Sequence, residues 1–163
     1  MKTAVYPGSF DPITYGHIDI IKRALNVFDK LYIIISVNPR KHTTFNQEER
    51  IDMVTHVLKD YLKRIEVVTS ETLTVEHAIK LGASHIVRGL RALTDFEYEF
   101  QMTHANRVLA KNIDSVFFMT DNKYSFLSST TVKEIAQFHG DLDTFVPAYV
   151  KEKLIKKHQM SLE

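Results

Sequence analysis

Tyr6-Pro7-Gly8-Ser9-Phe10-Asp11-Pro12-Ile13-Thr14-Tyr15-Gly16-His17 stands directly after a short apolar run and directly before an amphipathic pattern. This order predicts a buried strand, a tight turn, and a helix whose first turn carries Gly16 and His17. The amide groups at a helix N-terminus form an anion site, and a glycine there lets a phosphate approach the backbone. An imidazole can reach the same phosphate. The stretch therefore predicts a site for a nucleotide phosphate.

The composition is that of an ordinary globular domain. The chain has 163 residues, of which 44% are hydrophobic and 25% charged, and this length predicts one domain. With 21 basic and 20 acidic side chains the formal charge is +1, which argues against nucleic acid as a partner. The absence of cysteine excludes disulfides and thiolate catalysis, and the eight histidines show no metal-ligand spacing. No apolar run approaches membrane-spanning length, so we expect a cytoplasmic protein without a membrane partner.

Five short apolar runs alternate with helical patterns. The runs are residues 3–6, 31–37, 65–69, 85–87 and 115–119. Helical spacing follows the first run and recurs over residues 51–61, and further helices are predicted over 94–110, 130–138 and 148–157. Asn46 with Glu49, and Thr94 with Glu97, have the spacing of a helix cap. The alternation predicts a single α/β domain over residues 1–160, Rossmann-like and doubly wound around a five-stranded parallel sheet, with residues 161–163 as a tail.

The polar segments of the chain follow these strands. Ligands bind a doubly wound sheet beyond the carboxyl ends of its strands, near the point where the strand order reverses. Residues 7–17, 38–41, 88–91 and 121–130 come after the first, second, fourth and fifth strands. We therefore expect four loops to converge on one binding site.

Each motif in these loops has a structural and a functional interpretation. Neither GxGxxG nor GxxxxGK[ST] is present, so any phosphate must be held in another way. Thr14-x-Gly16-His17 could be a simple helix cap with an exposed histidine. Arg88-Gly89-Leu90-Arg91 could be a solvated basic turn, or its two guanidinium groups could hold phosphate oxygens. Convergence on one edge of the sheet favours the functional interpretation of both.

Three weaker signals remain. Lys41 could contact a phosphate, although Arg40 competes with it for that role. The hydroxyl-rich residues 124–131 could cap the following helix or bind phosphates at its N-terminus. Acidic and aromatic residues interleave over residues 95–100, where most side chains are structural by helical spacing and Glu99 is the candidate ligand contact.

Taken together, these motifs resemble the bacterial phosphopantetheine adenylyltransferase family of nucleotidyltransferases, which carry a (T/H)xGH signature. The resemblance covers residues 2–155. Residues 7–17 match the first superfamily motif, and residues 128–133 match the second, with Lys133 where many members have arginine. Ser9 stands where many members have threonine, a change that keeps the hydroxyl. Residues 88–92 and 95–99 resemble the pantetheine branch rather than the nicotinate-mononucleotide or cytidylyl branches.

The resemblance implies transfer of the adenylyl group of ATP to 4′-phosphopantetheine, giving dephospho-coenzyme A and pyrophosphate by in-line attack without a covalent intermediate. It implies Mg²⁺ carried with ATP, no metal site on the protein, and a homohexamer. Its implied catalytic residues are His17, Lys41 and Arg91, and its implied phosphopantetheine contacts are Ser9, Lys41, Thr74 and Arg88. The implied ATP site consists of Ser9, Phe10, His17, Gly89, Leu90, Arg91, Glu99, Tyr124, Ser125, Phe126, Leu127, Ser128, Ser129 and Thr130.

Three other functions fit parts of the sequence. Another adenylyl- or cytidylyltransferase would share the scaffold and differ in its acceptor. A nucleotide sensor would keep the pocket and transfer nothing. A fragment of a class I tRNA synthetase would share the Gly-His helix start, but length, charge and the lack of a KMSKS-type loop argue against it.

Overall fold

The computed structural model describes residues 1–37, 42–91 and 93–160. Within these ranges the elements are β1 (Thr3–Gly8), α1 (Tyr15–Leu25), β2 (Lys30–Ser36), α2 (Gln47–Val57), a 3₁₀ helix (Lys59–Tyr61), β3 (Ile65–Ser70), α3 (Thr74–Lys80), β4 (His85–Leu90), α4 (Leu93–Leu109), β5 (Asp114–Met119), a second 3₁₀ helix (Asn122–Tyr124), α5 (Ser129–Gln137) and α6 (Ala148–Met160). In this described part of the chain, no helix combines the length and the apolar character that crossing a membrane requires.

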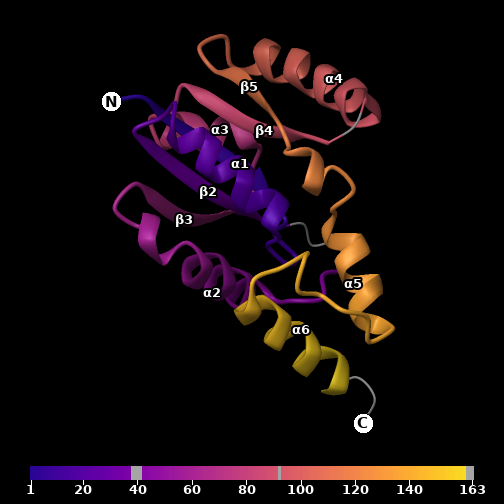
Figure 1. Ribbon diagram of the computed structural model, residues 1–163. Helices are drawn as coiled ribbons and strands as arrows, with labels where there is room; N and C mark the ends of the chain where they lie inside the picture. The colour runs from indigo at the N-terminus through magenta and orange to yellow at the C-terminus, as the bar shows by residue number, and fades with distance from the viewer. Residues whose placement is uncertain (38–41, 92, 161–163) are drawn as a thin grey trace.

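The five strands form one parallel sheet in the order β3-β2-β1-β4-β5 (Figure 1). From β1 the chain steps outward through β2 to β3 and then returns to the other side of β1 for β4 and β5. The strand order therefore reverses between β1 and β4, which makes the carboxyl ends of these two strands the switch point of the sheet. The prediction of a five-stranded, doubly wound parallel sheet is confirmed.

Two hydrophobic cores cover the two faces of the sheet. The larger core joins one face to α1, α2, α5 and α6, and the smaller core joins the other face to α3 and the segment after α4. Side chains along a strand alternate between the faces, so Val5 and Tyr6 belong to different cores. In β4 the same alternation directs Arg88 toward α4, whereas Gly89 lies against α1.

Two strands, β1 and β4, extend two or more residues beyond their predicted ends. Residues 88–90, predicted as a loop, belong to β4 and pair with residues 117–119 of β5. Residues 7 and 8 likewise belong to β1 and pair with residues 34 and 35 of β2. Strand pairing between neighbours is invisible to a local apolar pattern, which ends at the first polar or glycine residue. As a consequence, Arg88 and Gly89 are held by the sheet itself rather than by a turn.

Helices α4 and α2 also differ from the prediction at their ends. Helix α4 begins at Leu93, so Thr94 lies inside the helix and is not its cap. The Asp95 carboxylate instead accepts a hydrogen bond from the backbone N–H of Arg91, at 3.2 Å. Helix α2 ends at Val57, and the apolar spacing continues in a 3₁₀ helix beyond the buried Leu58. Helix α3 was not predicted.

Candidate active site

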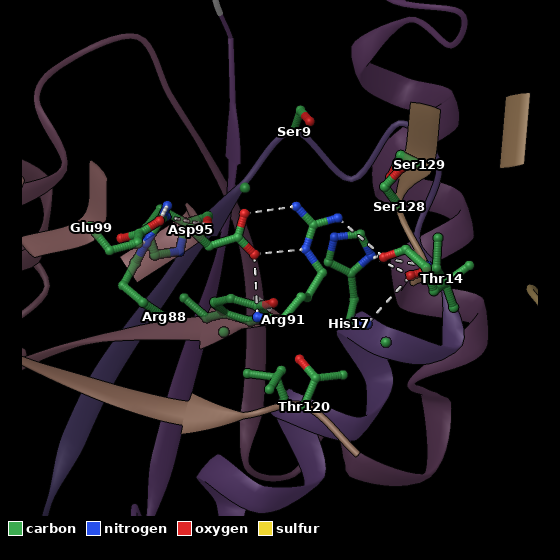
Figure 2. A pocket seen from close by; sticks show the side chains of 17 residues that line it. Ser9, Thr14, His17, Arg88, Arg91, Asp95, Glu99, Thr120, Ser128 and Ser129 are labelled. Atoms are coloured by element: carbon green, nitrogen blue, oxygen red, sulfur yellow. Dashed lines mark hydrogen bonds and ion pairs between the residues drawn. The ribbon is translucent and has the colours of Figure 1, made fainter. Parts of the chain in front are cut away.

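A cavity of about 310 Å³ opens at the switch point of the sheet (Figure 2). It is bounded by the ends of β1 and β4, the first turns of α1 and α4, and the segment leading into α5. Nine of the predicted site residues line it: Ser9, His17, Arg88, Gly89, Arg91, Glu99, Leu127, Ser128 and Ser129. Three of the four predicted loops therefore converge here, and the fourth, residues 38–41, lies outside the described residues.

His17 is fixed by a reciprocal cap at the start of α1. The Thr14 side chain accepts a hydrogen bond from the His17 N–H, and the Thr14 N–H donates to Nδ1 of His17 at 3.0 Å. Because Nδ1 accepts a hydrogen bond from the Thr14 N–H, the ring proton belongs on Nε2. Burial, reinforced by the positive charge of Arg91, lowers the pKa of His17 to about 4. His17 is therefore a neutral imidazole that offers an Nε2–H donor to the cavity.

Arg91 supplies a positive charge to the same cavity. Its Nε lies 3.2 Å from Oδ2 of Asp95, and one of its terminal nitrogens donates to the Leu127 carbonyl at 3.2 Å. In Figure 2 the side chains of Arg91 and His17 point into the cavity, with Asp95 beyond Arg91. The other terminal nitrogen donates to Oδ1 of Asp95 at 3.3 Å, so α4 and the segment before α5 orient the guanidinium, and each terminal nitrogen keeps one further N–H that could meet an anion.

The N-terminus of α5 closes a further side of the cavity. Ser128 is the cap residue, and its hydroxyl accepts from the Thr131 N–H at 3.0 Å. The Ser129 hydroxyl donates to the Pro12 carbonyl at 2.8 Å and so ties α5 to the turn after β1. Helices α1 and α5 both present their N-termini to one cavity, which favours binding of a polyanion such as a nucleotide phosphate chain.

An ion pair separates this cavity from a second one of about 200 Å³. Arg88 Nε donates to Oε2 of Glu99 at 2.7 Å, and a second bond joins the same two side chains. Arg88 also donates to the Pro7 carbonyl at 3.3 Å. Thr74 lines the second cavity together with Arg88 and Glu99, and the unpredicted residues Tyr98, Met102 and Asn106 complete this side of it.

A buried carboxylate joins the segments around the first cavity. Asp11 accepts hydrogen bonds from the N–H groups of Thr44 and Phe45, at 3.0 and 2.9 Å, and pairs with Lys133. The buried Arg50 donates to the carbonyl groups of Ser9 and Ser36, at 2.8 and 3.2 Å. These contacts fasten the turn after β1 to β2, to α5 and to the segment that leads into α2.

The other predicted site residues lie around the cavity rather than in its wall. Phe10 is fully buried, and its ring packs against the imidazole of His17 with 5.0 Å between the ring centroids. Leu90 is buried within β4, and Tyr124 stacks on Tyr15. The remaining three, Ser125, Phe126 and Thr130, are exposed. Lys41, predicted for both phosphate roles, lies outside the described residues.

No group of three or more histidine or acidic side chains that could hold a metal ion occurs within residues 1–37, 42–91 and 93–160.

Several residues that shape the site were not among the predicted contacts. Asp95 orients Arg91, and Thr120 and Tyr6 line the first cavity. Arg91 precedes α4, which begins at Leu93, so its contact with Asp95 depends on how the chain enters that helix and not on helical spacing. Tyr6 and Thr120 reach the cavity only because the strands that carry or precede them are assembled in the sheet, which no local sequence pattern shows.

A parallel sheet whose switch point carries two helix N-termini, a neutral imidazole and a guanidinium group is typical of proteins that bind nucleotide phosphates. A family model described as cytidylyltransferase-like matches residues 5–135. The chain is 51% identical to a phosphopantetheine adenylyltransferase of Caldanaerobacter subterraneus subsp. tengcongensis, over 99% of this chain and 100% of the relative. It is 46% identical to a phosphopantetheine adenylyltransferase of Alkaliphilus metalliredigens, over 96% of this chain and 99% of that one. The chain therefore belongs to the cytidylyltransferase-like family and, within it, to the phosphopantetheine adenylyltransferases.

Solved structures with low sequence identity share the fold. Plasmodium falciparum nicotinic acid mononucleotide adenylyltransferase complexed with NaAD is 15% identical, with a TM-score of 0.70 over 96% of each chain. The same enzyme complexed with APC is 16% identical, with a TM-score of 0.72 over 95% of this chain and 94% of that chain. The family resemblance inferred from the motifs is confirmed.

Proposed function

We propose that this protein transfers the adenylyl group of ATP to 4′-phosphopantetheine and forms dephospho-coenzyme A and pyrophosphate. The observation that carries the proposal is the pair of adjoining cavities at the switch point, which share Pro7, Gly8, Arg88 and Glu99. The first cavity has the donors for a nucleotide phosphate chain. The second is a suitable place for the acceptor, whose phosphate would approach the nucleotide past Arg88.

The reaction requires little proton transfer. An oxygen of the acceptor phosphate, already anionic near neutral pH, attacks the α-phosphorus of ATP. The bond between this phosphorus and the bridging oxygen breaks, and its electron pair leaves with pyrophosphate. Catalysis then depends on positioning and on stabilising charge at the reacting phosphates.

The residues divide this work by position. His17 Nε2–H donates to an oxygen of the α-phosphate, for which a neutral donor in a fixed orientation is suited. Arg91 and the N-terminus of α5 hold the leaving pyrophosphate. Thr74 and Arg88 contact the acceptor. The positive charge of Lys41 bridges the attacking phosphate of the acceptor and the α-phosphate of ATP. Mg²⁺ accompanies ATP and lowers the charge of the phosphate chain.

We also propose that the chain forms a homohexamer. Exposed large apolar side chains are frequent on α4: Phe96, Tyr98, Phe100, Met102, Val108 and Leu109. Exposed apolar surface of this extent on one helix favours an interface with another protein chain. Light scattering should give a mass six times that of the 18.9 kDa chain, and a monomer would contradict this part of the proposal.

The function is tested by pyrophosphate release from Mg-ATP with three acceptors: 4′-phosphopantetheine, nicotinate mononucleotide and glycerol 3-phosphate. We expect release only with 4′-phosphopantetheine. Release with another acceptor would overturn the substrate while keeping the reaction class. Binding of ATP without release in any mixture would instead indicate a nucleotide sensor.

A further inference from the structure

Tyr6 places a phenol at the floor of the first cavity. The residue is only 6% exposed, and its ring meets the Phe10 ring edge-on with 5.5 Å between centroids. Its hydroxyl is next to β4, since a Cβ added to Gly89 would lie 3.8 Å from that oxygen. Tyr6 lines the cavity with His17 and Arg91, yet neither the motifs nor the proposed reaction assigns it a role.

The Tyr6 hydroxyl has no hydrogen-bond partner among the described residues. Buried tyrosine hydroxyls normally have one, and each exception needs an explanation. The oxygen is not sealed inside the protein, because His158 Nε2 is the sole buried, unpartnered side-chain nitrogen or oxygen in the described ranges. The hydroxyl therefore opens onto the cavity that Tyr6 lines.

The Tyr6 phenol is a hydrogen-bond donor, and the charged side chains around it do not accept its hydrogen bond. Burial raises the pKa of Tyr6 well above its usual range, opposed by Arg88 and Arg91, so the hydroxyl keeps its proton. Guanidinium groups donate and cannot accept. The Glu99 oxygens hydrogen-bond Arg88, and no hydrogen bond joins them to the Tyr6 hydroxyl. The acceptor can therefore come from a molecule in the cavity, either solvent or a bound ligand that displaces it.

We propose that Tyr6 is a nucleotide-binding residue whose hydroxyl donates a hydrogen bond to an oxygen of the nucleotide held in this cavity. The inference rests on the proposed function, which places ATP there. Its consequence is specificity: a ligand without an oxygen at this point leaves the phenol unpaired, and the bound complex loses affinity.

Tyr6→Phe separates this role from a structural one. Phenylalanine keeps the ring packed against Phe10 and removes only the hydroxyl. If the hydroxyl contributed to the fold, its loss would lower the melting temperature of the ligand-free protein. If it serves the ligand, the melting temperature of the ligand-free protein stays the same or rises, and ATP binding weakens about three- to tenfold.

The experiment is isothermal titration calorimetry of Mg-ATP into the wild type, Tyr6→Phe and Tyr149→Phe. Tyr149 is the matched control, since its hydroxyl donates to Asp52 at 2.7 Å and it lines neither cavity of the proposed site. We expect a loss of ATP affinity in Tyr6→Phe alone, with 4′-phosphopantetheine binding unchanged. Equal ATP affinity in Tyr6→Phe and wild type would overturn the inference, as would a loss confined to 4′-phosphopantetheine.

Two analogues identify the acceptor atom. If 2′-deoxy-ATP or 3′-deoxy-ATP abolishes the difference between wild type and Tyr6→Phe, the acceptor is the missing ribose hydroxyl. If the difference persists with both analogues, the acceptor is a phosphate oxygen or the ribose ring oxygen. A wild type that binds no ATP would overturn the proposed function together with this inference, whereas binding unaffected by Tyr6→Phe overturns the inference alone.

Discussion

Lys133 Nζ lies 3.0 Å from Oδ2 of Asp11, and this ion pair joins α5 to the turn after β1 across 122 residues of chain. The Asp11 side chain is 5% exposed and the Lys133 side chain 27%. Asp11 also accepts hydrogen bonds from the N–H groups of Thr44 and Phe45. One carboxylate thus connects three segments around the nucleotide cavity, and Lys133 supplies its counter-charge.

Replacing Lys133 with methionine should destabilise the protein. The substitution keeps the apolar stem and leaves the Asp11 carboxylate with two amide donors but no cation. Because Asp11 is buried, we expect the free energy of unfolding in urea to fall by about 1–3 kcal/mol. Lys151→Met is the control, since its partner Asp143 is exposed and the pair should contribute nothing measurable. Equal stability of Lys133→Met and wild type would show that the pair with Asp11 does not support the site.

His17→Ala should remove a donor that acts on the reacting phosphate. By comparison with the loss of one preorganised donor, we expect turnover to fall roughly a hundredfold or more, with a smaller effect on folding. Steady-state kinetics with a parallel thermal melt separates the two effects. His77→Ala provides a control on α3, where no site role is assigned to the histidine. Near-normal turnover in a folded His17→Ala protein would exclude the proposed role.

The lowered pKa of His17 predicts how stability depends on pH. In the unfolded chain this histidine binds a proton below about pH 6.5, whereas in the folded protein it does so only below about pH 4. The unfolded state therefore binds more protons across this window, and stability falls as the pH decreases through it. We expect His17 to account for about 2–3 kcal/mol of this loss.

His17→Gln isolates that contribution, because glutamine does not titrate. Urea unfolding of both proteins from neutral pH to about pH 4 should show a steeper loss for the wild type. Parallel curves for the two proteins would mean that His17 titrates alike in the folded and unfolded states.

Gly16→Ala should stabilise the fold and impair the site. A Cβ at this position would meet Thr14, Leu127 and Tyr124 at ordinary contact distances of 3.6 to 3.8 Å. Alanine also favours the helical backbone of α1, so the free energy of unfolding should rise by about 0.5–1 kcal/mol. The added methyl group would narrow the nucleotide cavity, which Gly16 lines, and the KM for ATP should increase. A variant that is more stable and equally active would show that ATP does not approach this backbone.

The sequence was a good guide to the elements and a poor guide to their ends. Alternation of apolar runs and helical patterns predicts all five strands, because a parallel sheet buries its strands on both faces. The pattern breaks at Arg88 and Gly89, although hydrogen bonding with β5 continues through them. Helix α3 has seven residues and begins after Leu73, which makes no side-chain cap, so neither length nor cap revealed it.

The site was predictable where its residues are adjacent in sequence. The reciprocal contacts of Thr14 and His17 and the cap at Ser128 belong to single helix starts, which local motifs describe well. The pairing of Arg88 with Glu99 could not be predicted, since it depends on which face of β4 meets α4. The sequence predicts Arg88 and Glu99 as separate ligand contacts, but it does not predict that they form an ion pair with each other.

The ion pair between Arg88 and Glu99 is the common wall of the two cavities, and this has a consequence for inhibitors. The two spaces also share Pro7 and Gly8 at the carboxyl end of β1, so a molecule that occupies both would pass around the ends of β1 and β4. Linking a nucleotide fragment to an acceptor fragment makes the second binding event intramolecular, and its effective concentration is set by the linker. Weak fragments for the separate cavities should therefore combine into a tight ligand, provided that the linker passes beside the Arg88 guanidinium.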